Sequence, residues 1–295
     1  MATIYTNQSS NIRKTWILMS VFFVVVIALG WFASYYFQNP SVLYFFVAFS
    51  ILMNIASYWY SDKMVIKMTG AKPAKREEYF DFYTTVENLS ITAGLPMPKI
   101  YIINDPAPNA FATGRDKKHA VVAVTTGLLQ TLDKTELEGV IAHELSHIGN
   151  RDMLLSTTVV ILVGFVSILS NIFLRSHFLG GGRGRDNRLG AILMVAGIVM
   201  AILAPIIATF IRLSISRKRE FLADASGALL TRYPEGLAKA LEKIGKYSQP
   251  MARASDATAH LFISNPFGAK SMRGLHRLFL THPPVEERIK ILRGM

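Results

Sequence analysis

The segment that decides the fold is residues 133–150, which reads DKTELEGVIAHELSHIGN. Asp133, followed three residues later by Glu136, has the capping-box pattern of a helix N-terminus, so the segment is predicted to be helical. Residues four apart lie on one face of a helix, and His143 and His147 are therefore expected to point the same way. Two such imidazoles can bind one metal ion, and neutral imidazole suits zinc.

Glu144 follows His143 directly and lies about 100° from it around the helix axis. At that angle its carboxylate can reach a water beside the metal without being a ligand itself. Zinc lowers the pKa of such a water to about 7, and a neighbouring carboxylate can take its proton. The far side of the helix carries an apolar stripe whose burial would turn the histidines toward a cleft: Leu137, Ile141, Leu145 and Ile148.

A zinc site needs a third protein ligand, and the chain has no cysteine to supply it. No third histidine follows closely, since the position six residues after His147 is Met153. The best candidates lie in RKREFLADASGALL, where Glu220 and Asp224 are four residues apart on one helical face. We expect Glu220 to bind the metal and Asp224 to accept the free ring N–H of a ligating histidine. The alternative is an exposed acidic pair that neutralises residues 217–219.

The rest of the chain is unusually apolar, with 51% hydrophobic and only 18% charged residues among 295. This composition excludes a disordered protein. Four runs contain no charged residue and reach the length of about 20 residues that a helix needs to cross a bilayer. These runs are residues 16–37, 42–60, 154–174 and 191–211. We therefore expect four membrane helices.

The formal net charge is +12, and basic residues gather at the edges of the apolar runs. Arg13 and Lys14 precede the first run, and five more Lys or Arg residues lie between residues 63 and 76. By the positive-inside rule, the N-terminus and the segment after the second run are cytoplasmic, and residues 38–41 form an outer turn. No base-reading motif is present, so we expect no nucleic-acid partner.

The turn of the second hairpin, residues 175–190, leaves the topology of that hairpin open. It holds four arginines and one acidic residue, which opposes the positive-inside bias if the turn lies outside. Either both runs cross the bilayer or they are partly embedded in protein. The glycine-rich stretch of this turn, LGGGRGRDNRLG, lacks the Gly-Lys-Ser/Thr ending of a phosphate-binding loop. We interpret it as a flexible hairpin loop.

Two more polar segments remain, at residues 61–153 and 212–295. The first is predicted to contain a helix over residues 75–93, ended by Gly94 and Pro96. It also contains β-rich stretches at residues 99–105, 109–114 and 119–125. The second segment is predicted to be mostly helical. The expected domain boundaries are therefore 1–60 and 154–211 for the two hairpins, with 61–153 and 212–295 as two parts of one catalytic domain.

In this order, the motifs resemble the HtpX-type membrane zinc metalloproteases, which are related to the CaaX prenyl endopeptidases. The resemblance covers essentially the whole chain. It rests on the early hairpin and on NAFATG (109–114), HELSH (143–147) followed by GNRD, REFLADASGA (219–228) and HPPVEERI (282–289). It agrees with Glu220 as third ligand. It implies an α+β membrane protein in which four hydrophobic helices accompany a mostly helical, zincin-like catalytic domain with a small β-sheet.

The resemblance also implies roles that spacing alone does not assign. Asn109, with Ala110 and Phe111, would lie on an edge strand that holds the substrate backbone by β-augmentation. His282 would donate to the tetrahedral oxyanion, and Arg288 would orient it or assist. The alternative is that His-Pro-Pro starts a helix whose Arg288 is on the surface. The remaining histidines show no partner pattern and are expected to be structural or exposed: His119, His177, His260 and His276.

We therefore expect an integral-membrane endopeptidase with one zinc ion per chain and Glu144 as general base and then general acid. Following the family, it would cleave misfolded or damaged membrane proteins at the cytoplasmic face of a bacterial inner membrane, in stress-related quality control. Two alternatives are a proteolytically silent zinc-binding scaffold or adaptor, and a transporter or channel. Glu144 argues against the first, since zinc binding does not need it. The second would require ionisable groups within the spans, and the four runs hold only scattered Ser, Thr and Asn.

Overall fold

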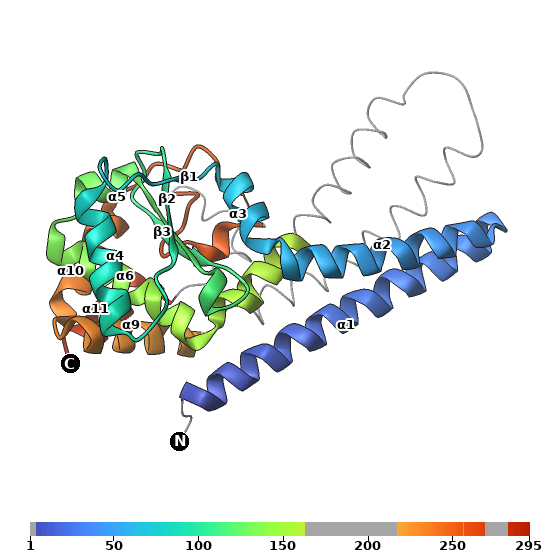
Figure 1. Cartoon of the computed structure of the whole chain (residues 1–295), viewed down its shortest axis with the longest axis horizontal. Helices are drawn as coiled ribbons and strands as arrows, with labels where there is room; N and C mark the ends of the chain where they lie inside the picture. The colour runs from blue at the N-terminus through green and yellow to red at the C-terminus, as the bar shows by residue number, and fades with distance from the viewer. Residues whose placement is uncertain (1–3, 163–216, 256, 269–282) are drawn as a thin grey trace.

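The computed structural model describes residues 4–162, 217–255, 257–268 and 283–295. Figure 1 shows a long helical hairpin, α1 (Ile4–Phe37) and α2 (Pro40–Trp59), that projects from a rounded domain of helices around a small sheet. Most of the third and fourth predicted membrane runs, the turn between them and His282 lie outside the described residues. The mostly helical fold with a small sheet is as predicted. Within the described ranges, two helices are long and apolar enough to cross a membrane, and these contain the first two of the four expected runs.

The turn of the first hairpin lies within the expected residues 38–41, but it is shorter because α2 begins at Pro40. Asn39 precedes α2 and its side-chain oxygen accepts a hydrogen bond from the Ser41 N–H at 3.0 Å, while Pro40 takes the first helical position. At the other end, α1 begins at Ile4, well before the predicted apolar run opens at Trp16. Its 34 residues are about 50 Å long at 1.5 Å per residue, which exceeds the roughly 30 Å of a bilayer core. The polar start of α1 therefore reaches beyond the apolar span.

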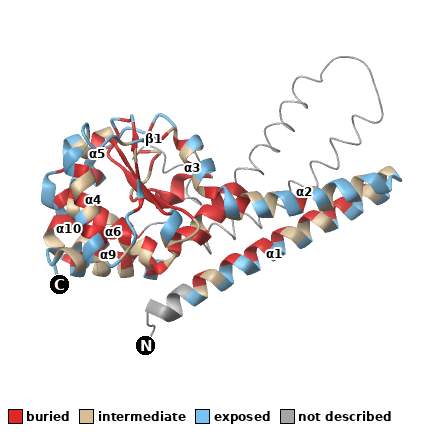
Figure 2. Ribbon diagram, viewed as in Figure 1, coloured by how far each residue is buried: buried red, intermediate tan, exposed pale blue. Residues whose placement is uncertain are grey.

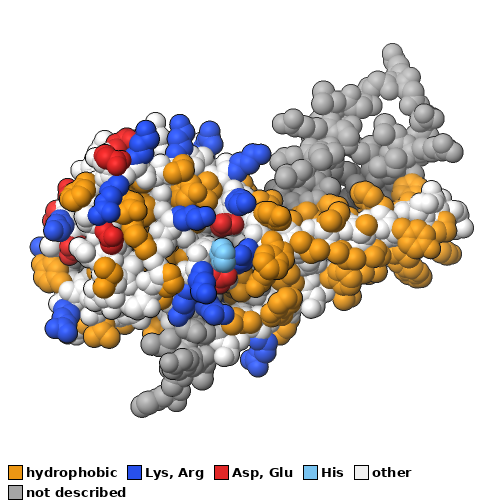
Figure 3. Space-filling view, viewed as in Figure 1, with side chains coloured by type: hydrophobic (Ala, Val, Ile, Leu, Met, Phe, Trp, Pro, Cys, Tyr) orange, Lys and Arg blue, Asp and Glu red, His pale blue; other side chains and the backbone are white. Residues whose placement is uncertain are grey.

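One face of α1 packs on α2 and the other is open. The buried face carries a stripe with helical spacing: Leu18, Phe22, Val26, Leu29 and Ala33. Gly30 lets the helices approach closely, because a Cβ there would collide with Phe46. The outer faces expose large apolar side chains, including Trp31 at 64% and Tyr44 at 71%. Figure 2 shows exposed residues along the hairpin, and Figure 3 shows hydrophobic side chains over much of its visible face. Such a surface fits contact with lipid.

Three short elements lead from the hairpin into the sheet. α3 (Ser61–Thr69) ends at Gly70, whose φ of 70° places it in the left-handed region, and β1 (Lys72–Pro73) follows. The helix predicted over residues 75–93 is α4 (Phe80–Thr92) and begins five residues later than expected. The reason is a turn in which the Glu78 and Tyr79 N–H groups both donate to the Lys75 carbonyl oxygen.

The sheet has the order β1-β2-β4-β3. β2 (Lys99–Ile103) runs parallel to β4 (Val121–Thr125), and β3 (Ala110–Thr113) is antiparallel to β4. The three β-rich stretches of the sequence are therefore strands, with ends that differ by one or two residues from the prediction. β3 is at the edge of the sheet, as expected for the segment that contains NAFATG.

Alternate strand residues point into two cores on opposite faces of the sheet. Ala110, Val122 and Val124 face a core shared with helices of the rounded domain. Phe111 and Ala123 face a second core shared with the buried stripe of α1 and with the apolar helix Asp152–Leu162. The helices of the rounded domain are α5 (Thr126–Thr131), α6 (Lys134–Asn150), α9 (Arg217–Thr231), α10 (Pro234–Lys246) and α11 (Val285–Leu292), with 3-10 turns at Lys117–His119 and Ala259–Leu261. α6 lies at the centre, against α4, α9, α10 and β3.

Candidate metal centre

The α6 helix starts with the predicted capping box. The Asp133 carboxylate accepts from the Glu136 N–H at 2.9 Å, and the Glu136 carboxylate accepts from the Asp133 N–H at 2.9 Å. Lys243 of α10 pairs with the buried Glu136 at 2.6 Å and joins the two helices. The four residues of the predicted apolar stripe are all buried. Burial of that stripe fixes the rotation of α6, which directs His143 and His147 toward α9.

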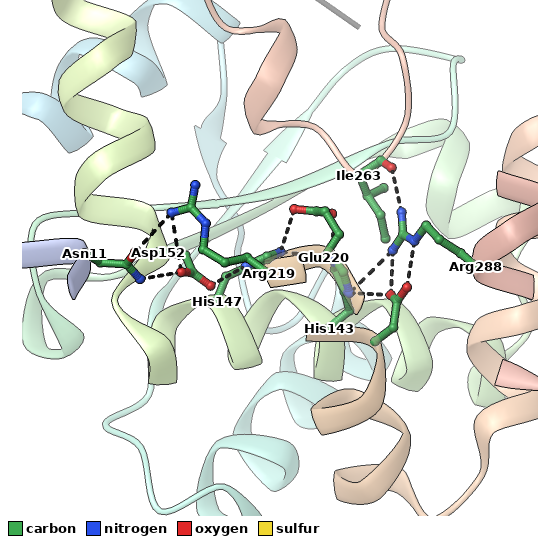
Figure 4. Close-up of polar contacts among 9 residues, drawn as sticks. Asn11, His143, His147, Asp152, Arg219, Glu220, Ile263 and Arg288 are labelled. Atoms are coloured by element: carbon green, nitrogen blue, oxygen red, sulfur yellow. Dashed lines mark hydrogen bonds and ion pairs between the residues drawn. The ribbon is translucent and has the colours of Figure 1, made fainter. Parts of the chain in front are cut away.

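His143, His147 and Glu220 come together as one group of donor atoms, all within 4.8 Å of one another. The two Nε2 atoms are 3.2 Å apart, and Glu220 oxygens lie 3.8 Å from Nε2 of His143 and 3.7 Å from Nε2 of His147. With ligand bonds of about 2.0–2.2 Å, the donors around a tetrahedral zinc ion lie roughly 3.3–3.5 Å apart. These side chains therefore fit a zinc site. Figure 4 shows the residues of the centre and their polar partners.

The acidic pair of α9 is buried, with Glu220 7% and Asp224 1% exposed. The alternative of an exposed pair is therefore wrong. Close packing of α9 on α6 causes the burial, because a Cβ on Gly227 would lie 3.0 Å from the His143 backbone nitrogen. A glycine at this position lets α9 approach near enough to place Glu220 beside both histidines.

Asp224 holds the ring of His143 from behind, with its Oδ1 2.9 Å from Nδ1. Arg288 in turn donates to Asp224 twice, through Nε at 2.8 Å and Nη2 at 2.7 Å. Burial alone would raise the pKa of Asp224, but the hydrogen bonds from Arg288 and His143 outweigh it and lower the pKa to about 2. Arg288 is 0% exposed, so the alternative of a surface arginine is wrong. Its guanidinium also donates to the Ile263 carbonyl oxygen at 3.4 Å.

Asp152 plays the matching part for His147, and the sequence did not predict this role. Its Oδ2 lies 3.1 Å from Nδ1 of His147. Burial lowers the pKa of His147, but the hydrogen bond with Asp152 and the charge of Glu220 raise it to about 9. Arg151 caps α6 with φ 56°, in the left-handed region, and so turns Asp152 back toward the helix. The one signal for this role in the sequence is that Asp152, the last residue of GNRD, follows His147 by only five residues.

Glu144 points into a cleft beside the metal ligands. The cleft is lined by Ala112, Glu144, His147, Asp152, Met153, Ser156, Arg219, Glu220, His260 and Leu261. Glu144 is 2% exposed, and this burial raises the pKa of its carboxyl to about 7. The Ala112 backbone N–H donates to the same carboxylate, so the edge strand β3 meets the candidate base directly.

The three residues expected to hold substrate lie at the start of that strand, but they are engaged within the protein. Asn109 Nδ2 donates to the Ser264 carbonyl oxygen at 3.0 Å, and its Oδ1 accepts from the Ser264 N–H at 3.2 Å. The Ala110 carbonyl oxygen accepts from the Ile263 N–H at 2.9 Å. Phe111 is buried against Phe262 with ring centroids 5.2 Å apart. The first part of the β3 edge is therefore already covered by residues 263–264.

The other histidines have different surroundings. His119 is exposed and pairs with Asp116 at 2.8 Å, as expected for a surface residue. His260 is buried in the cleft lining, where its Nε2 lies 3.0 Å from the Ser156 carbonyl oxygen. Spacing gave no sign of this position, because His260 is more than one hundred residues from the HELSH helix. His177 and His276, like His282, lie outside the described residues.

Comparison with known proteins agrees with the geometry. The model of a family described as Peptidase family M48 matches residues 80–295. This chain belongs to peptidase family M48. The match includes α6, α9 and α11, the elements that carry the ligands, Asp224 and Arg288.

Several curated relatives of this M48 peptidase are similar along its full length. "Protease HtpX homolog" proteins of Caldanaerobacter subterraneus subsp. tengcongensis and Thermoanaerobacter pseudethanolicus are 49% and 48% identical, each over 99% of this chain and 98% of the relative. The one of Dictyoglomus turgidum is 45% identical over 99% of this chain and 95% of the relative. The crystal structure of S. mikatae Ste24p aligns with a TM-score of 0.48 at 18% identity, over 98% of this chain and 67% of that chain. The expected family and enzyme class are confirmed: the chain is a zinc-dependent metalloendopeptidase.

The arrangement of these side chains in this M48 peptidase is suited to the following chemistry. Zinc, when bound by His143, His147 and Glu220, supplies positive charge that polarises a carbonyl and acidifies water. Asp224 and Asp152 keep the ring protons on Nδ1, which leaves each Nε2 free to ligate. Glu144, with its pKa near neutrality, is suited to take a proton from water and return it to a leaving amine.

Proposed function

We propose that this M48 peptidase is an integral-membrane endopeptidase that cleaves misfolded or damaged membrane proteins on the cytoplasmic side of a bacterial inner membrane. The single observation that carries the proposal is the position of Glu144, buried in the cleft beside the three ligand side chains. A zinc-binding scaffold would not need a carboxylate there. The alternative of a proteolytically silent adaptor is therefore not favoured.

Substrate backbone would enter along the open part of the β3 edge. In an antiparallel pair, alternate residues turn their N–H and C=O groups away from the partner strand. The Asn109 carbonyl oxygen accepts from the Thr125 N–H of β4, so Ala110 and Ala112 face outward. Ala110 already pairs with Ile263, whereas Ala112 lines the cleft next to Glu144. Since the Ala112 N–H meets Glu144, we infer that the Ala112 carbonyl oxygen, rather than Asn109, Ala110 or Phe111, accepts from the substrate backbone.

Membrane substrates suit a site that lies close to the apolar hairpin. The helix Asp152–Leu162 follows His147 almost at once and packs in the same core as the buried stripe of α1. A protein segment that leaves the bilayer beside this hairpin would therefore have a short path to the cleft. The cytoplasmic side follows from the basic residues that flank the hairpin, and the second hairpin, residues 154–211, would bring the number of crossings to four.

His282 and Arg288 keep the roles that the resemblance implies, with one change for Arg288. Its guanidinium donates to Asp224 and Ile263, and its Nη2 lies 3.5 Å from Nδ1 of His143, so it acts by positioning His143 and Asp224 and does not contact substrate. We propose that stabilisation of the oxyanion belongs to His282.

The test is proteolysis by purified protein in detergent or liposomes, with casein and an unfolded membrane protein as substrates. Glu144→Gln is expected to retain zinc and to lower kcat by about 10²–10⁴-fold, because the carboxylate that moves the proton is gone. Glu138→Gln is the matched control in the same helix, outside the cleft lining, and should cleave as wild type does. A chelator should stop cleavage, and zinc should restore it. Full proteolysis by Glu144→Gln would remove Glu144 from the mechanism. If the zinc-loaded wild-type protein showed no proteolysis, that result would favour the adaptor.

A further inference from the structure

A buried polar cluster joins the start of the membrane helix α1 to the metal centre. It contains Asn11 of α1, Asp152 after α6 and Arg219 of α9, which are 3%, 5% and 9% exposed (Figure 4). Burying three such side chains is costly unless their polar groups find partners. The cluster is thus a specific connection between segments that lie 141 and 208 positions apart from Asn11 in the chain.

The Asn11 amide uses both its donor and its acceptor atoms in this cluster. Nδ2 donates to Asp152 Oδ1 at 2.6 Å and to the Asn150 carbonyl oxygen at 3.3 Å. Oδ1 accepts from Arg219 Nη1 at 3.3 Å. One side chain from α1 therefore holds the end of α6, the carboxylate beyond it and the residue that precedes the ligand Glu220.

The Asn11 amide contacts two residues that adjoin metal ligands: Asp152, the partner of His147, and Arg219, the neighbour of Glu220 in α9. Asp152 gives Oδ2 to Nδ1 of His147 and Oδ1 to Asn11, so the amide fixes the rotation of the carboxylate that orients the ligand. Arg219 is 3.7 Å from the same Oδ1 and lies next to Glu220 in α9. A change at Asn11 would therefore loosen His147 and Glu220 together.

We propose that Asn11 is a positioning residue of the zinc site, through which the membrane hairpin sets the affinity and geometry of the metal centre. The proposal rests on the metal site of the proposed function and adds a residue outside the segment that the M48 family model matches. α1 is one continuous helix from Ile4 to Phe37, so Asn11 is rigidly coupled to the apolar span that begins five residues later. The position of the hairpin thereby sets the position of this amide beside Asp152 and Arg219.

The test is the zinc dissociation constant of the full chain, measured by competition with a chromophoric chelator. Outer partners of metal ligands typically contribute 10–100-fold to affinity, so Asn11→Ala and Asn11→Leu are each expected to weaken zinc binding by about ten-fold. Asn11→Leu keeps the number and branching of the side-chain heavy atoms, so it removes the amide without leaving a cavity. The absorption spectrum of the cobalt-substituted protein should also shift, because the ligand geometry changes.

Thr15→Val is the matched control, one turn along the same helix. Thr15 is also buried, but its hydroxyl donates only to the Asn11 carbonyl oxygen of its own helix. This variant should bind zinc as wild type does. Melting temperatures of the metal-free proteins show whether any variant has simply lost its fold.

A double-mutant cycle tests whether Asn11 acts through Asp152. Asp152→Asn should weaken zinc binding more than Asn11→Ala, and Asn11→Ala should have little further effect in the Asp152→Asn background. Wild-type zinc affinity and cobalt spectrum in both Asn11 variants, or fully additive effects in the cycle, would overturn the proposal. Loss of proteolysis in wild type at normal zinc affinity would instead overturn the proposed function and leave this inference standing.

Discussion

At the scale of single residues, each histidine of the metal centre is oriented by a carboxylate, and the two carboxylates have different surroundings. Asp224 orients His143, and Asp152 orients His147. Asp224 is neutralised by Arg288, and burial lowers the pKa of His143 to about 4. Asp152 lies near Glu220 and Glu144, and His147 has its pKa raised to about 9. The carboxylates that favour a proton on His147 also favour a divalent cation between the ligands. Three carboxylates line the cleft, those of Glu144, Asp152 and Glu220, and Arg219 offsets only part of their charge.

Glu220 and Asp224 are expected to differ when each is replaced. Glu220→Ala removes a ligand and should abolish stoichiometric zinc binding. Asp224→Asn keeps the size of the side chain and should weaken zinc binding by only about 10–100-fold, since it alters the partner of a ligand. Zinc content after dialysis at a fixed free zinc concentration distinguishes the two. Equal zinc content in wild type and Glu220→Ala would exclude Glu220 as a ligand.

The residues that could be predicted from the sequence are those with regular spacing inside one helix. His143 and His147 share a face because they are four apart, and Glu220 and Asp224 obey the same rule. Asp152 was missed because its position depends on a left-handed residue at the end of α6, which no periodicity reports. His260 and Asn11 approach the site through tertiary packing alone.

At the scale of elements, the metal centre depends on how closely α9 packs against α6. Gly227 is the contact point, since a Cβ there would be 3.0 Å from the His143 nitrogen and 3.2 Å from the Ala142 carbonyl carbon. Those are backbone atoms, which cannot move aside as the end of a side chain can. The distance from Glu220 to the histidines is therefore set by a glycine two helical turns away.

Gly227→Ala should push the two helices apart. Overpacking typically costs about 1–3 kcal/mol, which outweighs the gain of up to about 1 kcal/mol that alanine gives a helix interior. We expect a lower melting temperature and weaker zinc binding. Gly149→Ala is the control on α6, because the nearest atom to its new Cβ is Leu95 Cδ1 at an ordinary 3.9 Å. If Gly227→Ala had the melting temperature and the zinc affinity of wild type, the spacing between α6 and α9 would be shown to adapt.

Element boundaries could be predicted from the sequence where a local signal fixes them. The start of α6 was correct because Asp133 and Glu136 form a capping box, whereas α2 begins at Pro40, two residues before the predicted run at residue 42. The start of α4 was wrong because a turn at Lys75 delays it, and hydrophobic periodicity does not report that turn. α1 was predicted too short because apolarity ends at Trp16 while the helix continues through polar residues.

At the scale of the whole molecule, aromatic and basic side chains gather where the helical hairpin meets the rounded domain. Trp16 stacks on Tyr58 with ring centroids 6.0 Å apart, and Arg115 lies 4.7 Å from the ring centroid of Trp59. Aromatic and basic side chains of this kind collect at the membrane–water interface. If the hairpin crosses the bilayer as proposed, this boundary lies between the apolar span and Asn11, and we expect the rounded domain and the start of α1 on the same side of the membrane.

The orientation of the molecule can be tested because the chain has no cysteine, so that one introduced thiol is the only one. Ser41 is exposed in the first turn of α2, next to the hairpin turn, and Lys118 is exposed on the rounded domain. A membrane-impermeant maleimide added to intact cells should label Ser41→Cys and leave Lys118→Cys unlabelled. After the cells are opened, both should react, which controls for the reactivity of each thiol. Labelling of Lys118→Cys alone in intact cells would place the catalytic domain outside, where a cytoplasmic quality-control protease could not work.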